Sequence, residues 1–248
     1  MTAPPRQLPL PFRHEPDYHH AAFLEDASNA AALAWLGNTA AWPAGRLAVW
    51  GEAGCGKTHL LHRWAGEQSG LYVSGAALRA WPDPLGPGAG GVAIDDADQA
   101  AEEPLLHLLN DCAEAGRPAL LAAVTPPARW PIRLPDLASR LRAVTAVRIG
   151  PAEDALLRAL LLRLLRERQL AVPEAVQEWL LRHLPRTPQA VREAAARLDR
   201  LALATGARVT RATALGVIES LAEDTGLHGD EINAHREVAP SLAGMPLL

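Results

Sequence analysis

One short segment of the sequence has the residue types and spacing of a phosphate-binding loop. Starting at Gly51 the chain reads GEAGCGKT, which fits the pattern G-x-x-x-x-G-K-[ST]. Glycines at Gly51, Gly54 and Gly56 would let the backbone wrap closely around a polyphosphate, with N–H groups pointing inward. Lys57 would reach the terminal phosphates, and the hydroxyl of Thr58 would bind Mg²⁺. The segment therefore predicts a site for a nucleoside di- or triphosphate.

Two further residues belong to this predicted site. Cys55 lies inside the loop, and His59 follows it on the expected helix, so we include both among the nucleotide-contacting positions. A plain packing or surface role is the alternative for His59. The loop also contains Lys57, the single lysine beside 23 arginines in the chain. A compact ammonium fits a crowded phosphate loop better than a broad guanidinium does.

A pair of carboxylates about 40 residues further on is the expected partner of the loop. The sequence VAIDD places Asp95 and Asp96 directly after a short apolar run. In P-loop proteins such a pair holds Mg²⁺ and orients the attacking water, roles that we give to Asp95 and Asp96 respectively. The alternative is that both residues cap the next helix, which is a common use of aspartate.

Apolar segments and helical patterns alternate in the region that must position these residues. We predict strands at 46–50, 70–74, 91–96, 118–124 and 143–149. We predict helices at 26–41, 58–68, 99–115 and 136–141. Short apolar strands alternating with helices indicate an α/β fold, in which a parallel five-stranded sheet is covered on both faces. After Gly150 only helical patterns follow, at 152–168, 173–184, 188–205 and 210–222.

These patterns predict four parts of the chain. They are an extended, proline-rich arm at 1–20, an α/β nucleotide-binding domain at 21–150, a small all-helical domain at 151–222 and a polar tail at 223–248. The composition agrees, since 49% of residues are hydrophobic and only 4% are aromatic, which favours a helix-rich globular protein. A net charge of -4 argues against nucleic-acid binding through overall charge. Two cysteines, no secretory leader and no long apolar run predict reduced thiols and no membrane span.

Several motifs resemble the AAA+ proteins of the DnaA/Hda family, which regulate the initiation of chromosomal replication. GKTHLL (56–61), the strand end IDD and SRL (139–141) are similar to the AAA+ module of DnaA. LPDLASRL (134–141) and the N-terminal QLPLPF (7–12) are closer to the Hda branch. The resemblance implies an AAA+ P-loop NTPase fold with a helical lid, bound ADP or ATP with Mg²⁺, and a cytoplasmic, nucleoid-associated bacterial protein. It leaves a homo-oligomer open.

The resemblance also assigns roles to two arginines. Arg140 matches the arginine finger, which in AAA+ assemblies projects into the nucleotide site of a neighbouring subunit, here DnaA-ATP. Arg192 matches the second sensor in the lid, which contacts the bound nucleotide. The alternative for both is a surface arginine on an amphipathic helix. One position departs from the family, because Val124 stands where a polar sensor is expected before Pro126 and Pro127. This departure puts intrinsic ATPase activity in doubt.

The N-terminal motif has the features of a peptide that docks into a pocket. Its predicted contact residues are Gln7, Leu8, Leu10, Pro11 and Phe12. The glutamine offers a donor and an acceptor, the apolar side chains offer surface, and the prolines keep the peptide extended, which lowers the ordering cost of binding. By resemblance, its partner is the sliding clamp, the β subunit of DNA polymerase III. Contact with DNA would then be mainly indirect, through the clamp.

Three functions are compatible with these features. The first is an adaptor that docks on the clamp, promotes hydrolysis of DnaA-bound ATP and so limits re-initiation. The second is a DnaA-related ATPase that loads a helicase. The third is a nucleotide-bound scaffold that takes part in DnaA-family assembly but activates nothing.

Overall fold

The computed structural model describes residues 23–79 and 90–225. The predicted clamp motif at 7–12 lies outside this range, as does the tail after residue 225. The described residues form two compact units. One contains the residues up to 160 together with 186–189, and the other contains 161–185 and the residues from 190 onward.

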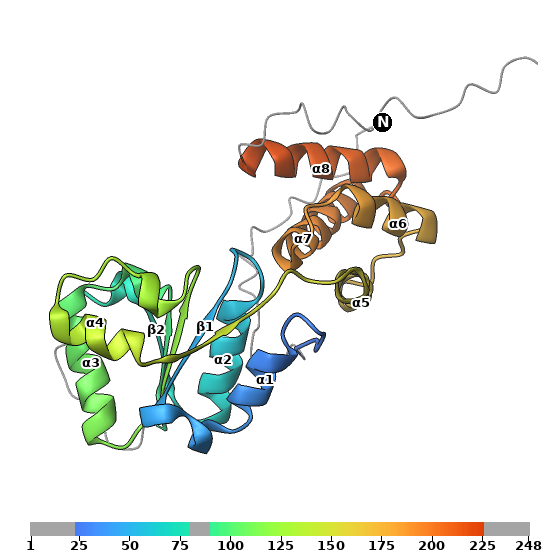
Figure 1. The fold of residues 1–248 in the computed structure, drawn as a ribbon. Coiled ribbons are helices and arrows are strands. Elements are labelled where there is room, and N and C mark those ends of the chain that lie inside the picture. Colours follow the sequence, from blue (N-terminus) through green and yellow to red (C-terminus); the bar gives the residue numbers. More distant parts are fainter. Residues whose placement is uncertain (1–22, 80–89, 226–248) are drawn as a thin grey trace, which may run out of the picture. The chain divides into compact units, whose positions relative to one another are not determined.

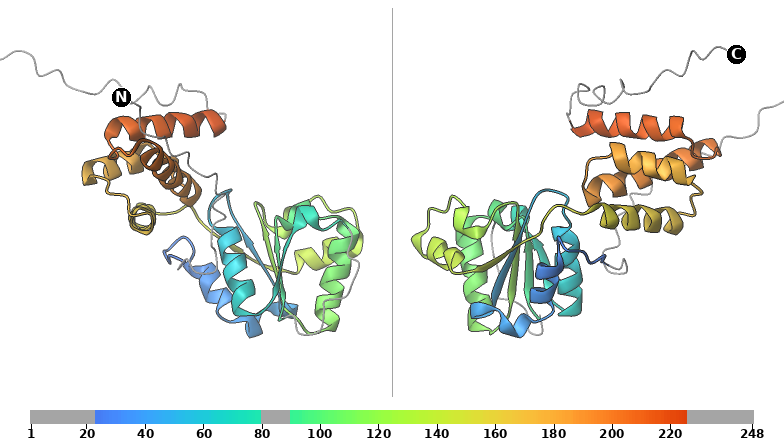
Figure 2. Two further views of the ribbon diagram at one scale, coloured as in Figure 1. Left: turned by 180° about the vertical axis from the view of Figure 1, so that it is seen from behind. Right: turned by 45° about the vertical axis from the view of Figure 1, so that its right-hand side comes forward.

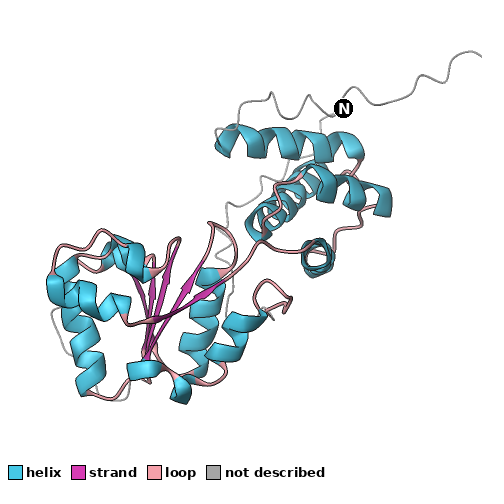
Figure 3. Cartoon of the chain, viewed as in Figure 1, coloured by secondary structure: helices cyan, strands magenta, loops and turns pink. Residues whose placement is uncertain are grey.

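The first unit is built on a parallel five-stranded sheet (Figure 1, Figure 3). Its strands are β1 (Arg46–Trp50), β2 (Leu71–Ser74), β3 (Val92–Asp95), β4 (Ala119–Ala123) and β5 (Thr145–Arg148). They lie in the order β2-β3-β4-β1-β5, and every neighbouring pair is parallel. All five predicted strands are therefore confirmed, with ends that differ by at most two residues.

Helices cover both faces of the sheet (Figure 1, Figure 2). On one face, α1 (Ala30–Leu36) and α2 (Lys57–Glu67) pack on Leu47 and Val49 of β1. On the other face, α3 (Glu102–Glu114) and α4 (Pro135–Arg142) form a core with Ala48 of the same strand. Successive residues of a strand point to opposite faces, so Leu47, Ala48 and Val49 must all be apolar to fill the two cores. This is why the strand reads as an apolar run after Arg46.

One helix prediction is wrong. The sequence pattern predicts a single helix over 26–41, but the structure has α1 followed by a separate 3₁₀ turn at Thr39–Ala41. Gly37 and Asn38 lie between them, and Asn38 has a non-helical ψ of 63°. Glycine is a weak helix former, and the apolar pattern alone does not register this interruption.

The second unit is entirely helical where it is described. It contains the end of α5 (Asp154–Glu167), then α6 (Glu174–His183), most of α7 (Pro188–Thr205) and α8 (Arg211–Thr225). Its core consists of small and branched apolar side chains, among them Leu164, Leu180, Ala194, Leu198, Ala214 and Val217. No described helix of the chain is long and apolar enough to cross a membrane.

Candidate nucleotide site

The predicted phosphate loop connects the carboxyl end of β1 to the first turn of α2. Gly56 has φ = +106°, a conformation that residues with a Cβ rarely adopt. A Cβ at Gly51 would lie only 2.6 Å from the carbonyl oxygen of Ile149. Both glycines are therefore required by the path of the chain. The N-terminus of α2 then opens directly behind the loop, where its dipole and free N–H groups favour an anion.

Lys57 is held inside the loop. The residue is buried, with 7% relative exposure, and Nζ donates to the carbonyl oxygens of Gly51 at 2.8 Å and Glu52 at 2.9 Å. These bonds satisfy two of the three donors of the ammonium group. They keep the cation at the mouth of the loop, next to the backbone that would surround a phosphate.

Thr58 and Asp95 meet across the gap between α2 and β3. The Thr58 hydroxyl donates to Oδ2 of Asp95 at 2.6 Å, and Asp95 is buried, with 5% exposure. Its other oxygen, Oδ1, accepts the backbone N–H of Asp96 at 3.1 Å. A buried carboxylate needs such partners, and these hold Asp95 in one orientation.

Tyr72 is a third partner of Asp95 that the sequence analysis missed. It lies on β2, and its hydroxyl donates to the same Oδ2 atom at 2.9 Å. The ring of His62, on α2, stacks on the Tyr72 ring with centroids 3.8 Å apart. In the sequence, Tyr72 is simply a tyrosine in the strand predicted before the VAIDD strand. Its contact with Asp95 follows only from the pairing of β2 with β3.

Asp96 differs from Asp95 in exposure and backbone conformation. It is exposed, has φ = +45° and immediately precedes the 3₁₀ turn Ala97–Gln99. Partial burial, followed by the negative charges of Asp95 and Asp98, raises the pKa of Asp96 above its ordinary value. A carboxylate that is exposed beside the loop and has a raised pKa is suited to accept a proton or to orient a water molecule.

The donor set at this edge fits Mg²⁺. The ion prefers oxygen ligands and usually takes only one or two groups from the protein, with phosphates and waters completing the octahedron. The Thr58 hydroxyl and the Asp95 carboxylate provide such oxygens. Within 23–79 and 90–225 there is no cluster of three or more His, Cys, Asp or Glu residues that would form a separate metal cage. The residues would thus hold Mg²⁺ together with a bound nucleotide, and the ion would neutralise phosphate charge.

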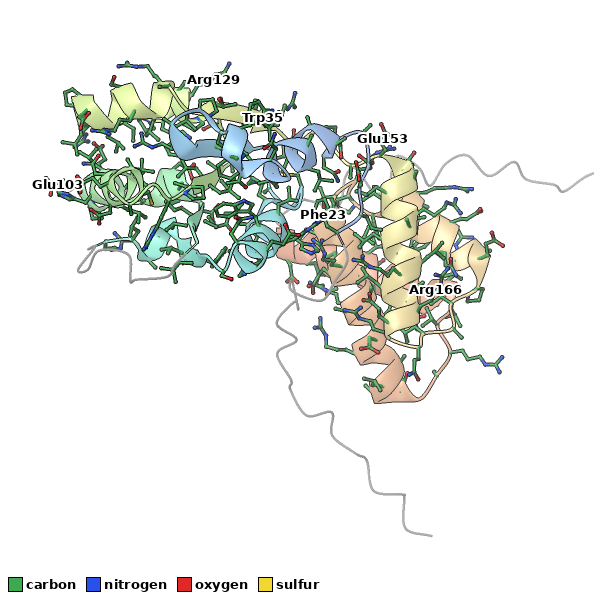
Figure 4. All side chains as sticks on the ribbon, turned by 90° about the horizontal axis from the view of Figure 1, so that it is seen from below. Phe23, Trp35, Glu103, Arg129, Glu153 and Arg166 are labelled. Carbon is green, nitrogen blue, oxygen red and sulfur yellow. The ribbon has the colours of Figure 1, made fainter. Side chains whose placement is uncertain are left out.

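Cys55 and His59 make different contributions to the loop. Burial raises the pKa of the Cys55 thiol, and the sulfur lies 3.9 Å from Nζ of Lys57. His59 is buried and packs edge-to-face on Phe23, with ring centroids 5.2 Å apart (Phe23 is labelled in Figure 4). The imidazole of His59 therefore has a packing role, and any nucleotide contact of this residue would come from its backbone.

Val124 lies next to the loop at the end of β4. Trp50 pairs with Ala123, and the N–H of Gly51 donates to the Ala123 carbonyl. Val124, the next residue, therefore lies at the same sheet edge as the loop and Asp95. Val124 is 47% exposed. Where the family resemblance leads us to expect a polar sensor, the structure presents two methyl groups.

Arg140 lies at the opposite edge of the sheet. It is in the last turn of α4, which leads into the start of β5, and that start pairs with the start of β1. Burial, followed by the charge of Arg140, lowers the pKa of Arg46, the first residue of β1. A strand rises about 3.3 Å per residue, so the length of β1 separates Arg140 from the loop of its own chain. Nε of Arg140 is 3.1 Å from Oδ1 of Asp136, and its side chain is 33% exposed.

Arg192 belongs to the helical unit. It is partly exposed on α7, and its contact with a nucleotide stays a prediction.

Of the residues predicted from the sequence, the structure brings together Lys57, Thr58, Asp95 and Asp96. It adds Tyr72 to this group.

Comparison with solved structures identifies the fold. No family model matches the sequence. Domain III of the replication initiation protein DnaA from Thermotoga maritima is similar, with a TM-score of 0.68 and 17% identity over 83% of this chain and 97% of that chain. AMPPCP-bound DnaA from Aquifex aeolicus gives a TM-score of 0.53 and 14% identity over 87% and 94% of the two chains.

A motor protein outside this group has the same architecture. The Holliday junction branch migration motor RuvB from Thermotoga maritima gives a TM-score of 0.53 and 21% identity, over 71% of this chain and 61% of that chain. Together with the loop and the sheet order, these likenesses show that the chain has the AAA+ P-loop NTPase fold. The fold class predicted from the sequence is therefore confirmed.

Proposed function

We propose that the chain is a nucleotide-bound AAA+ adaptor of the Hda type. It binds ADP or ATP with Mg²⁺ in the loop that starts at Gly51, docks on the DNA polymerase sliding clamp through residues 7–12 and presents Arg140 to DnaA-ATP. Hydrolysis of the DnaA-bound ATP would then limit re-initiation of replication. The chain would act as a negative regulator by completing the active site of another protein.

Nucleotide binding is supported by the geometry of the loop. Lys57 is buried beside the loop backbone, and Thr58 and Asp95 form a 2.6 Å pair suited to Mg²⁺. Two of the DnaA structures with this fold contain AMPPCP, an ATP analogue. A cation, a helix N-terminus and a carboxylate–hydroxyl pair are the parts that phosphoryl recognition requires.

One observation carries the adaptor role. The chain's own nucleotide edge holds Val124 at the expected sensor position, while Arg140 lies at the other end of the sheet, partly exposed. An arginine so placed serves a neighbouring molecule better than its own loop. A planar guanidinium can stabilise charge on a transferring phosphoryl group. The lid arginine, Arg192, would contact the chain's own nucleotide.

The test is hydrolysis of DnaA-bound ATP in the presence of clamp-loaded DNA. Wild type is expected to stimulate hydrolysis, and Arg140→Ala is expected to lose the stimulation, since an arginine finger contributes about 10³-fold or more in rate. Arg142→Ala is the matched control, because Arg142 is exposed in the same last turn of α4. Full stimulation by Arg140→Ala, or none by wild type, would contradict the proposal.

A clamp pull-down tests the docking motif separately. The double variant Gln7→Ala, Phe12→Ala is expected to lose clamp binding while nucleotide binding is unchanged. Retention of clamp binding by this variant would show that residues 7–12 are not the docking motif.

A helicase-loading ATPase is the second candidate. The intact Thr58–Asp95 pair favours it, because this pair is part of a site that can support hydrolysis. It predicts ATP-driven assembly and helicase binding, with no requirement for Gln7 or Phe12. The same pull-down, combined with a helicase-binding assay, distinguishes the two functions.

A further inference from the structure

Glu102 joins the start of α3 to the segment that leads into α4. Its Oε1 accepts the backbone N–H of Arg133 at 3.0 Å, and its Oε2 accepts the N–H groups of Arg133 at 3.1 Å and Leu134 at 2.7 Å. These bonds lower the pKa of the Glu102 carboxyl. The carboxylate is therefore bonded through both oxygens to a backbone segment 31 and 32 residues away in sequence.

One hydrogen bond of Glu102 reaches the residue that precedes the first turn of α4. Leu134 occupies the N-cap position of this helix and Pro135 follows at the first helical position. Neither residue has a side chain that can accept a hydrogen bond, and α4 has no side-chain cap of its own. Glu102 thus fixes the start of α4 from a different helix.

The remaining attachment of α4 is apolar. Leu137 and Leu141 are fully buried in the core beneath α3 and β4. Hydrophobic contacts are non-directional, so they hold the helix against the sheet but resist a small rotation or slide weakly. Hydrogen bonds to a carboxylate are strong and directional, and those of Glu102 supply the restraint that the apolar face lacks.

The hydrogen bonds from Glu102 to Arg133 and Leu134, called the anchor below, also link α4 to the end of β3 at the nucleotide site. Glu102 opens α3 shortly after Asp96, and the 3₁₀ turn Ala97–Gln99 lies between them with Ala97 buried. The strand end that contains Asp95 and the helix that carries Arg140 are therefore joined through one short, packed segment and one carboxylate.

We propose that Glu102 is a positioning residue for Arg140, because its carboxylate sets the register of α4. This inference rests on the proposed role of Arg140 as a finger for DnaA-ATP. A finger must reach the phosphoryl group within a fraction of an ångström, and a displacement of 1 Å costs on the order of 100-fold in rate. Arg140 lies about 1.7 helical turns after Leu134, so a shift at Leu134 moves it directly.

The first test does not depend on DnaA. Amide hydrogen exchange of residues 130–142 is compared between wild type, Glu102→Ala and Glu103→Ala. Glu103 is the matched control, since it follows Glu102 in the first turn of α3 and is exposed (Figure 4). Exchange at Arg133 and Leu134 is expected to rise at least fivefold in Glu102→Ala alone. Equal exchange in the two variants would overturn the anchor itself.

The second test measures DnaA-ATP hydrolysis against the concentration of each variant. Glu102→Ala is expected to lower the maximal stimulated rate about tenfold and to leave the half-saturating concentration unchanged, because docking on the clamp is unaffected. Glu102→Gln, whose amide oxygen can still accept one backbone N–H, is expected to recover part of the rate. Glu103→Ala is expected to match wild type.

The outcomes separate this inference from the proposed function. If exchange rises in Glu102→Ala but the maximal rate stays at the wild-type value, Glu102 anchors α4 without positioning the finger, and the inference is wrong. If wild type itself gives no stimulation while exchange rises as expected, the adaptor function fails and the anchor stands. A change in half-saturating concentration alone would assign Glu102 to docking instead.

Discussion

The two edges of the sheet are built in opposite ways. At the loop edge, formed by the ends of β1 and β3, Lys57 and Asp95 are buried and hydrogen-bonded to neighbouring groups. At the α4 edge, Arg140 is partly exposed and pairs with Asp136, one turn away on the same helix. Such i,i+4 pairs contribute only about 0.3–0.5 kcal/mol. The loop edge is thus a preorganised site within the chain, whereas Arg140 can leave its partner at little cost and engage another molecule.

The largest expected effect is at Lys57. Lys57→Ala removes the ammonium and its charge-assisted bonds to phosphate, each worth about 1.5–3 kcal/mol, and nucleotide affinity is expected to fall at least about 100-fold. Titration with a fluorescent nucleotide measures this. Arg142→Ala, at the α4 edge, is the control and is expected to bind normally. An affinity within twofold of wild type for Lys57→Ala would mean that the loop edge is not the nucleotide site.

A smaller effect is expected at Val124. Val124→Asp restores a polar group beside the loop, and the chain's own ATP hydrolysis is expected to rise about tenfold, a modest share of what a positioned polar group contributes. Single-turnover hydrolysis without DnaA measures it, and Val124→Ala is the control. If the hydrolysis rate of Val124→Asp does not increase, the lack of a polar sensor is not the cause of the functional difference between the two edges.

The expected effect of a substitution at Tyr72 is smaller than that at Val124. Tyr72→Phe leaves the ring stacked on His62 but removes the hydroxyl that donates to Asp95. The gain in nucleotide affinity caused by Mg²⁺ is expected to drop about fivefold, as one hydrogen bond to a charged group is lost. Affinity in EDTA serves as the internal control and is expected to match wild type. Equal losses with and without Mg²⁺ would point to a packing defect.

The smallest effect concerns Asp96 and pH. Its raised pKa means that the folded state holds the proton more tightly than the unfolded chain, so this stabilisation is present at low pH and is lost as pH rises through the folded pKa. Asp96→Asn removes the charge and tolerates the left-handed backbone. At pH 7 its free energy of unfolding is expected to exceed that of wild type by a few tenths of a kcal/mol, and this advantage is expected to shrink towards pH 4.

Urea denaturation at the two pH values measures the difference. Asp136→Asn at the α4 edge is the contrasting variant, since it loses the ion pair with Arg140 and is expected to gain nothing. A gain in both variants would mean that general charge reduction stabilises the protein.

The sequence was sufficient wherever local chemistry and pattern coincide. β1 was predicted with its observed bounds because it contains an apolar run that both faces of the sheet require, and the loop was recognised because Gly56 and Lys57 stand at the positions that its geometry demands. Asp95 was found by its position at a strand end. These features depend on neighbours in sequence, and the sequence contains them directly.

Contacts between distant segments could not be predicted in this way. Tyr72 binds Asp95 only because β2 lies beside β3, and Glu102 meets Leu134 only because α3 and α4 share one face of the sheet. Neither residue is unusual in its local sequence. The interruption after α1 was missed for another reason, since the apolar pattern continues across Gly37 and Asn38 while the backbone does not.

The burial of Lys57 makes the loop a natural reporter for lysine-directed chemistry. Because the chain has a single lysine, a lysine-specific protease has one peptide bond to cut, between Lys57 and Thr58, at the start of α2. An amine-reactive label has only this side chain and the α-amino group as targets. Cleavage or labelling at Lys57 therefore reports on exposure of the phosphate loop, and a bound nucleotide is expected to slow both reactions.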